Sequence, residues 1–223
     1  MKKFVLIVAG GSGSRMGAEI PKQFMELLGK PVLMHTLEVF HKYDANAELI
    51  LVLPEMQKDY WSGLCGNHVF SIPHQVVSGG DNRFLSVRNG LRKIDGEGIV
   101  FIHDGVRPLV SPETLGRCFE MALKSGNAIP VLPVNESLRK TESDQTISVD
   151  RSLYFSVQTP QTFRTGQILE AFRQAYDPAF TDDASVAEKA GFSIHLVEGN
   201  RENIKITSPS DLIVAEAFLQ ANI

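Results

Sequence analysis

The sequence contains little of what marks several common classes of protein. It has two cysteines, Cys65 and Cys118, in 223 residues, which are too few and too far apart for a disulfide framework or a zinc knuckle. We expect both to be structural, since a free cysteine commonly behaves as a small buried hydrophobe. Lysine and arginine total 22 against 26 aspartates and glutamates, a formal charge of −4. Because no global basic field is present, we expect neither DNA nor RNA as a partner.

Long apolar runs and metal-ligand patterns are also missing. The apolar run FVLIVA at residues 4–9 is far shorter than the ~20 residues that a membrane-spanning helix needs. It starts so close to Met1 that no room is left for a signal or transit peptide, so we expect a cytoplasmic protein without a membrane anchor. The histidines at 35, 41, 68, 74, 103 and 195 lack the spacing of metal ligands, and no protein metal ligand is predicted.

What the sequence has is an ordinary globular composition, with 43% hydrophobic and 22% charged residues, and a regular alternation of segments. Short apolar runs lie at 4–9, 48–54, 75–80, 98–105 and 128–134, and helix-like segments lie at 31–43, 82–93 and 112–125. Further along we expect helices at 165–176, at 182–190 and from Ser208 onward, with strand-like segments at 192–199 and 203–207. The alternation predicts an α/β fold with a Rossmann-like, doubly wound and mostly parallel sheet, covered by helices on both faces. We expect one domain over residues 1–223, because no linker or repeat interrupts the chain.

Three polar clusters follow predicted strands, and sheets of this kind bind ligands beyond the carboxyl ends of their strands. The first cluster is the Gly-rich stretch AGGSGSRMG at 9–17. Its glycines permit a tight turn that exposes backbone N–H groups, and Arg15 and Lys22 add cations, so a polyanion such as a triphosphate is the expected ligand. A plain turn at the strand end is the alternative.

Two other phosphate-binding patterns fit this stretch poorly. A P-loop is excluded because no Gly-Lys-Ser/Thr follows the glycines. A dinucleotide-binding fingerprint would have its first two glycines in Gly11 and Gly13, but Met16 stands where the third belongs. Two added cations suit a triphosphate that is about to be cleaved, so the stretch is interpreted as catalytic.

The second and third clusters are SGGDNR and HDGVRP. In the second, the backbone at Gly80 could lie close to a planar ring while Asp81 and Ser86 read its edge, and a turn followed by a helix N-cap is an equal alternative. In the third, Asp104 and Arg107 could bind substrate hydroxyls or a metal-bound phosphate. They could also simply form an ion pair with each other.

Residues 135–157 break the alternation, with two extended halves around the polar turn SDQT. A solvent-exposed hairpin is only marginally stable alone, so one interpretation is an arm that packs on another subunit, and the other is a long surface loop. Asp182 and Asp183 are expected to cap the helix that follows them. Lys205, in the strand-like NIKIT, is either a solvated residue or a third cation at the ligand-binding edge.

Taken together, these blocks resemble the methylerythritol phosphate cytidylyltransferases of non-mevalonate isoprenoid biosynthesis, within the nucleotidyltransferase superfamily. The resemblance covers nearly the whole chain through AGGSGSRMG, PKQF, GGDNR followed by SV, HDGVRP, VDR, TPQTF, TDDAS, and VEGN with NIKIT. Ribitol phosphate cytidylyltransferases share several of these blocks, whereas TDDAS and the SV after GGDNR are features of the methylerythritol branch.

The resemblance implies that CMP is transferred from CTP to 2-C-methyl-D-erythritol 4-phosphate, giving 4-diphosphocytidyl-2-C-methyl-D-erythritol and pyrophosphate by in-line attack of the acceptor phosphate. It implies three catalytic cations, Arg15, Lys22 and Lys205. The expected CTP-binding residues are Ala9, Gly10, Gly11, Gly13, Ser14, Gly80, Asp81 and Ser86. The expected acceptor-binding residues are Asp104, Arg107, Ser137, Arg151, Thr159 and Thr181.

The resemblance also implies a homodimer, in which Arg151 on the arm reaches the acceptor phosphate bound by the other subunit. Mg²⁺ is expected as a cofactor that is held mainly by the CTP phosphates. The family's arm motif has Thr and Lys where this chain has Ser137 and Arg139. Because serine keeps the hydroxyl, we expect function to survive, and acceptor affinity is the property that this departure affects most directly.

Two alternatives to this function stay open. The first is a ribitol-5-phosphate cytidylyltransferase, since that family shares several blocks with this chain. The second is a non-catalytic CTP-binding protein of the same fold. The presence of both Arg15 and Lys22 argues against the second alternative, because cations placed for cleavage are not needed for binding alone.

Overall fold

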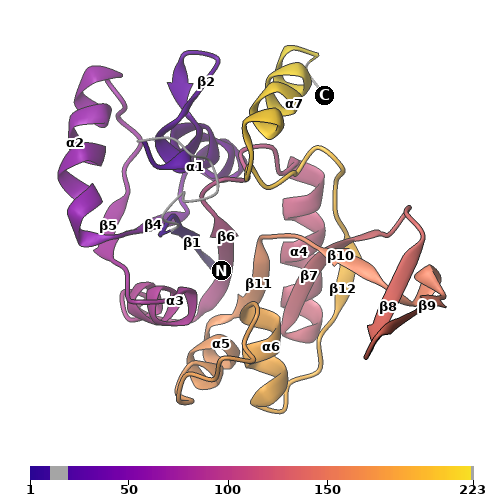
Figure 1. The fold of residues 1–223 in the computed structure, drawn as a ribbon. Helices are drawn as coiled ribbons and strands as arrows, with labels where there is room; N and C mark the ends of the chain where they lie inside the picture. The colour runs from indigo at the N-terminus through magenta and orange to yellow at the C-terminus, as the bar shows by residue number, and fades with distance from the viewer. Residues whose placement is uncertain (11–19, 222–223) are drawn as a thin grey trace.

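The computed structural model describes residues 1–10 and 20–221, and one large sheet dominates this part of the chain (Figure 1). The strand order is β10–β7–β11–β6–β1–β4–β5, and β12 also pairs with β7. The strands are β1 (Lys2–Val8), β4 (Glu48–Leu53), β5 (Gln75–Ser78), β6 (Gly98–Asp104), β7 (Asn127–Pro133), β10 (Phe155–Val157), β11 (Gln161–Arg164) and β12 (Leu196–Glu198). Two smaller sheets join β2 (Glu26–Leu27) to β3 (Lys30–Pro31) and β8 (Leu138–Glu142) to β9 (Gln145–Val149).

The large sheet is mostly parallel, as the sequence predicts. β1 runs parallel to both β4 and β6, β5 is parallel to β4, and β12 is parallel to β7. The antiparallel strands are β10 and β11, which flank a cis peptide between Thr159 and Pro160. The apolar runs predicted before residue 135 all form strands of this sheet. Their parallel arrangement brings the carboxyl ends of β1, β4, β5 and β6 to one edge.

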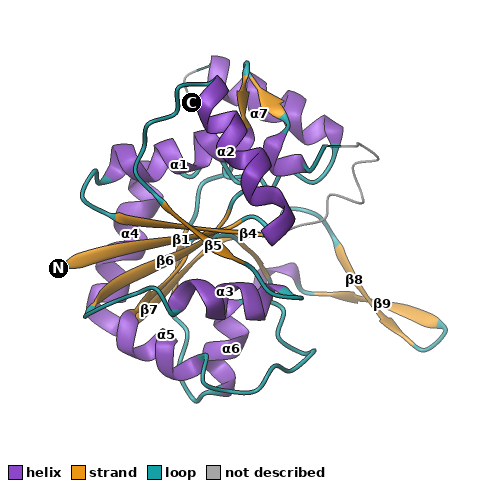
Figure 2. Ribbon diagram, turned by 90° about the vertical axis from the view of Figure 1, so that its left-hand side faces the viewer, coloured by secondary structure: helices purple, strands orange, loops and turns teal. Residues whose placement is uncertain are grey.

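Helices cover both faces of the sheet, as Figure 2 shows. They are α1 (Val32–Tyr43), α2 (Lys58–Asn67), α3 (Arg83–Leu91), α4 (Pro112–Ser125), α5 (Thr165–Ala171), α6 (Asp183–Lys189) and α7 (Pro209–Gln220). Phe4 and Leu6 of β1 join a buried cluster with α3, α5 and α6, whereas Val5 and Ile7 join one with α1, α2 and α4. Because burying one such side chain contributes about 1.5–3 kcal/mol, the two apolar faces of β1 hold it between the helix layers.

Helix ends follow ordinary capping chemistry. The Ser111 side chain accepts a hydrogen bond from the first turn of α4, and Gly126 ends that helix with a left-handed φ of 96°. Asn82 caps α3 through Leu85 N, and Asp182 caps α6 in a capping box. Residues 79–82 connect the end of β5 to α3. The amino end of α3 therefore lies at the edge of the sheet where the sequence predicts the ligand.

The predicted hairpin exists, but it is shorter than 135–157: it spans β8 and β9, and β10 at the end of this range belongs to the large sheet. β8 and β9 pair with each other alone and project from the body of the molecule (Figures 1 and 2). The apolar side chains of Leu153, Tyr154, Phe155 and Val157, which follow β9, are 45–76% exposed. The hairpin and its base thus present apolar surface that this chain alone does not cover.

Several predicted elements have different bounds in the structure. The helix predicted at 165–176 ends at Ala171, and the strand predicted at 192–199 is limited to Leu196–Glu198. The segment 203–207 forms no strand, because Ile204 and Ile206 pack against α7 instead of entering a sheet. The sequence also missed α2, whose one buried residue is Trp61, and β11. Among the helices described, none is long and apolar enough to cross a bilayer.

Candidate active site

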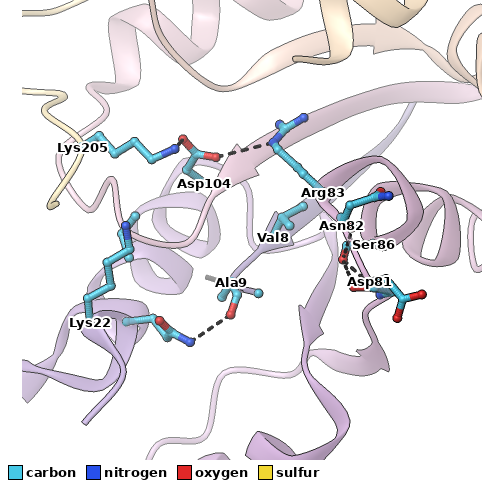
Figure 3. A pocket seen from close by; sticks show the side chains of 13 residues that line it. Val8, Ala9, Lys22, Asp81, Asn82, Arg83, Ser86, Asp104 and Lys205 are labelled. Atoms are coloured by element: carbon cyan, nitrogen blue, oxygen red, sulfur yellow. Dashed lines mark hydrogen bonds and ion pairs between the residues drawn. The ribbon is translucent and has the colours of Figure 1, made fainter. Parts of the chain in front are cut away.

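A pocket of about 250 Å³ lies at the carboxyl ends of β1 and β6 (Figure 3). It is formed by the end of β1, the turn η2 (Lys22–Phe24), the loop from β5 into α3, the end of β6 and the segment before α7. Its lining residues are Val8, Ala9, Gly10, Lys22, Gln23, Gly80, Asp81, Asn82, Arg83, Ser86, Asp104, Val106 and Lys205. Among these, the sequence predicts Ala9, Gly10, Lys22, Gly80, Asp81, Ser86, Asp104 and Lys205 as site residues. Two predicted cations, Lys22 and Lys205, therefore meet at one pocket.

The loop between β5 and α3 is shaped by one hydroxyl group. The Gly80 N–H donates to Ser86 Oγ at 3.1 Å, and this hydroxyl donates to the backbone oxygen of Asn82 at 2.9 Å. A Cβ at Gly80 would lie 2.5 Å from the Cβ of Leu85, so only glycine fits there. The loop presents a close backbone surface with the exposed Asp81 beside it. The helix N-cap that the sequence suggests is present through Asn82, and the contact of this loop with a planar ring stays a prediction.

Gln23 fixes the turn that carries Lys22. Its side chain is 1% exposed, and its Nε2 donates to the backbone oxygen of Ala9 at 3.0 Å and to Gln57 Oε1 at 2.8 Å. The turn η2 is thereby attached to the end of β1, where the Gly-rich stretch begins. Gln23 belongs to the motif PKQF, but its hydrogen-bond partners are known only from the fold.

Asp104, the last residue of β6, forms ion pairs with three cationic side chains. Its Oδ2 lies 3.0 Å from Lys205 Nζ and 3.2 Å from Arg107 Nε, and its Oδ1 lies 3.9 Å from Arg83 Nε. Burial would raise the pKa of this carboxyl, but the charges of Arg83, Lys205 and Arg107 hold its pKa well below its usual range. The predicted Asp104–Arg107 ion pair exists. Lys205 is a cation at the pocket, and its side chain is 42% exposed and accessible to a ligand.

Arg83 connects this edge to α6. Its Nη1 and Nη2 donate to the two carboxylate oxygens of Asp183 at 2.7 and 2.6 Å. Asp183 is fully buried and is not a second cap, since Asp182 fills that position. Against the cost of burial, the charge of Asp183 raises the pKa of Arg83, so the guanidinium stays charged. The sequence includes Arg83 in the second cluster but gives no signal for its partner, which is 100 positions away.

Behind Asp104, His103 is fully buried. Its Nε2 lies 2.9 Å from the backbone oxygen of Arg107, and its Nδ1 lies 3.1 Å from Thr159 Oγ1, which accepts from Asp104 N at 3.1 Å. Burial lowers the pKa of His103 to about 4, so the ring is neutral near pH 7. With Nε2 protonated it donates to Arg107, and its Nδ1 accepts from the Thr159 hydroxyl. This arrangement holds the end of β6 and fixes the backbone of Asp104.

Other predicted site residues lie elsewhere. Gly11, Gly13, Ser14 and Arg15 are outside the described residues. Ser137 is exposed at the start of the hairpin, and Arg151 is exposed just after β9, where it donates to the backbone oxygen of Asn135. Thr181 is exposed beside a smaller cavity that Arg83 also lines. Arg107 and Thr159 lie behind Asp104 rather than in the pocket lining, and the acceptor contacts predicted for all of these residues stay predictions.

The described residues offer no ready-made metal site. Across 1–10 and 20–221, no group of three or more His, Cys, Asp or Glu side chains could hold a metal ion. The pocket itself is lined by two carboxylates, Asp81 and Asp104, and the second is already paired with cations. Among the described residues, the pocket thus offers a metal ion few protein ligands.

The sequence matches the family model for 2-C-methyl-D-erythritol 4-phosphate cytidylyltransferase over residues 3–221. The chain belongs to this family. Curated relatives with this name include a protein of Bacteroides thetaiotaomicron, 52% identical over 98% of this chain and 100% of the relative. A Bacillus licheniformis relative is 38% identical over 97% of this chain and 95% of its own length. The family that the ordered motifs predict is thereby confirmed.

Solved structures agree with this membership. The chain is similar to 4-diphosphocytidyl-2C-methyl-D-erythritol synthase from Anaerococcus prevotii, with a TM-score of 0.82, 27% identity and 98% coverage of both chains. The 2-C-methyl-D-erythritol 4-phosphate cytidylyltransferase from Thermus thermophilus gives a TM-score of 0.81 at 32% identity, over 99% of this chain and 100% of that one. The α/β fold with a mostly parallel sheet is therefore the family's fold.

Proposed function

We propose that this protein transfers CMP from CTP to 2-C-methyl-D-erythritol 4-phosphate and releases pyrophosphate. The main support for this proposal is that Lys22 and Lys205 line the same pocket as the loop after β5, which contains Gly80. Full-length relatives that bear the name of this enzyme support the same reaction. The pocket can therefore be divided into a cation-rich half for phosphates and a loop for the base.

The reaction needs positive charge more than it needs a base. An oxygen of the acceptor phosphate forms a bond to the α-phosphorus of CTP, and the bond from that phosphorus to the bridging oxygen breaks to release pyrophosphate. The acceptor phosphate monoester is largely dianionic near neutral pH, since its second pKa is about 6. In the proposed mechanism Lys22 and Lys205, together with Arg15, neutralise the charge that develops on the α-phosphoryl oxygens and the leaving group.

The two substrates are assigned to different parts of the edge. The backbone around Gly80 and the side chains of Asp81 and Ser86 form the surface proposed for cytosine and ribose, because a flat ring needs a close backbone and short polar groups. The carboxylate of Asp104 is the group proposed for the hydroxyls of the acceptor. Lys205 lies beside it and can reach a phosphate on either substrate.

We propose that Mg²⁺ is the cofactor and that CTP carries it. The donor set fits this arrangement, since the pocket offers Asp81 but no cluster of acidic side chains among the described residues. Mg²⁺ prefers octahedral oxygen ligands and usually keeps several waters, which phosphate oxygens and solvent can provide. The ion would neutralise phosphate charge, and no protein ligand is assigned.

We also propose a homodimer that uses the hairpin β8–β9 as its arm. The exposed apolar side chains Leu153, Tyr154, Phe155 and Val157 at its base support this assembly, because aromatic and aliphatic residues are typical of the core of an interface. In such a dimer Arg151 and Ser137 would complete the acceptor site of the other subunit. Since CTP and polyol phosphates are solutes of the cytoplasm, we propose that the enzyme works there.

Comparing two acceptors tests the function. Purified protein with CTP and Mg²⁺ should release pyrophosphate rapidly with 2-C-methyl-D-erythritol 4-phosphate and slowly with ribitol 5-phosphate. The Lys22→Ala variant, prepared in the same way, controls for contaminating activity. Rapid release with ribitol 5-phosphate alone would overturn the acceptor assignment, and binding of CTP without turnover of either acceptor would favour a non-catalytic protein.

A further inference from the structure

Lys205 lies in a segment without regular secondary structure. Residues 201–207 form neither helix nor strand, yet Lys205 Nζ lies 3.0 Å from Asp104 Oδ2. One backbone hydrogen bond, from Ile206 N to Val106 O at 3.0 Å, ties this segment to the turn after β6. Because a helix or strand does not set its position, side-chain hydrogen bonds to neighbouring elements must contribute.

Asn203 supplies such a tether. It is fully buried, and its Nδ2 donates to the backbone oxygen of Thr159 at 2.8 Å. Its own backbone oxygen accepts from Arg107 Nη1 at 2.8 Å and from Gln158 Nε2 at 3.3 Å. Two residues before Lys205, one asparagine thus joins the segment to the turn after β6 and to the residues before β11.

The surroundings of the amide decide its orientation. Its nitrogen faces two oxygen acceptors, Thr159 O and Gln158 Oε1, the second at 3.5 Å. Exchanging oxygen and nitrogen would place the Asn203 oxygen against both acceptors and lose these bonds. Gln158 also donates to Asn200 O at 2.9 Å, which holds the start of the same segment. These hydrogen bonds are directional. They therefore fix the backbone position of the segment that carries Lys205.

We propose that Asn203, assisted by Gln158, is a positioning residue for Lys205. This inference rests on the proposed function, in which Lys205 acts on the phosphates. The Lys205 side chain must be able to move from Asp104 to a phosphate, while its backbone stays in place. A misplacement of about 1 Å in a group that acts on the reacting atoms can cost about 100-fold in rate. The Asn203 tether holds the backbone and leaves the exposed end of Lys205 free to reach its target.

The chain offers a matched control in Asn127. This asparagine is also fully buried, with Nδ2 donating to Ser193 O at 2.8 Å and Oδ1 accepting from His195 N at 2.9 Å. It is the first residue of β7, at the opposite edge of the sheet from the pocket. Replacing either asparagine by alanine removes a similar buried tether, but only Asn203 is attached to the segment of Lys205.

The test is a double-mutant cycle on kcat. Asn203→Ala should lower kcat by about 10- to 100-fold, with less than about a threefold change in the Kd of CTP, whereas Asn127→Ala should leave kcat unchanged. In a Lys205→Ala background, Asn203→Ala should have almost no further effect on kcat, because the group that it positions has been removed. Thermal unfolding of each variant measures the loss of stability separately.

Each outcome decides a different point. A full, additive effect of Asn203→Ala in the Lys205→Ala background would overturn the positioning role and leave the proposed function intact. A Lys205→Ala protein with normal turnover would instead contradict the catalytic role of Lys205 in the proposed function. If Asn203→Ala does not fold, Gln158→Met in the same cycle tests the tether, with an expected fall in kcat of several-fold that again disappears without Lys205.

Discussion

The buried histidine behind the pocket should make stability depend on pH. Burial of His103 lowers its pKa from 6.5 to about 4. In the unfolded chain the imidazole takes up a proton as the pH falls through 6.5, whereas the folded protein resists protonation until about pH 4. Between these values the unfolded state binds more protons, so acidification lowers the free energy of unfolding.

The size of the effect follows from the two pKa values. Their full separation corresponds to about 3 kcal/mol. Between pH 7 and pH 5 the unfolded histidine becomes almost fully protonated while the folded one stays neutral, which gives a loss of about 2 kcal/mol. This is a large share of the roughly 5–15 kcal/mol by which a domain is usually stable. Above pH 7 both states carry a neutral ring, and the contribution of His103 no longer varies.

Urea unfolding of the wild type and of His103→Gln at pH 7, 6 and 5 measures this contribution. The glutamine can still donate from Nε2 to the Arg107 backbone oxygen but does not titrate. The variant should be less stable at pH 7, yet it should lose about 2 kcal/mol less than the wild type on going to pH 5. Other titrating groups are common to both proteins. Equal losses in the two proteins would refute the reasoning.

Three further variants test the site. Lys22→Ala should lower kcat by orders of magnitude with a modest change in the Kd of CTP, because its charge matters most in the transition state; an unchanged rate would make Lys22 a surface residue. Arg151→Ala should mainly raise the KM of the acceptor, and mixing its chains equally with Lys22→Ala chains should restore about a quarter of the sites if arms cross between subunits. No recovery on mixing would contradict the crossed arm. Arg83→Ala should lower the free energy of unfolding by about 3–5 kcal/mol, because the buried Asp183 loses its ion-pair partner; urea unfolding should show partial recovery when Asp183→Asn is added.

Local patterns in the sequence were sufficient for much of the fold. The apolar runs that become β1, β4, β5, β6 and β7 are recognised from their length and their flanking polar residues. Ser111 and Pro112 mark the start of α4 because capping depends on neighbours within one turn. Gly80 is needed at a position where a Cβ would contact Leu85. In each of these cases, the residues that cause the structure are close in sequence to the residues that predict it.

The remaining features depend on partners that are distant in the chain. The segment 203–207 alternates like a strand, but a strand needs an open sheet edge, and here Ile204 and Ile206 contact α7. Gln23 and Asn203 belong to the motifs PKQF and NIKIT, but only the fold shows the backbone oxygens that they bind. Side-chain tethers of this kind have no spacing rule, so a single sequence could not predict them.

The charges around Asp104 make it a poor general base. A general base works best with a pKa near the operating pH, and the surrounding cations hold the pKa of this carboxyl well below its usual range. The acceptor phosphate brings its own negative charge, so no base is required. The cations Arg83, Arg107 and Lys205 surround the end of β6 and would repel one another without a counter-ion, and Asp104 lies within 4 Å of each. We infer that it keeps Lys205 at the edge of the sheet until a phosphate competes for it, while Asn203 keeps the backbone from following.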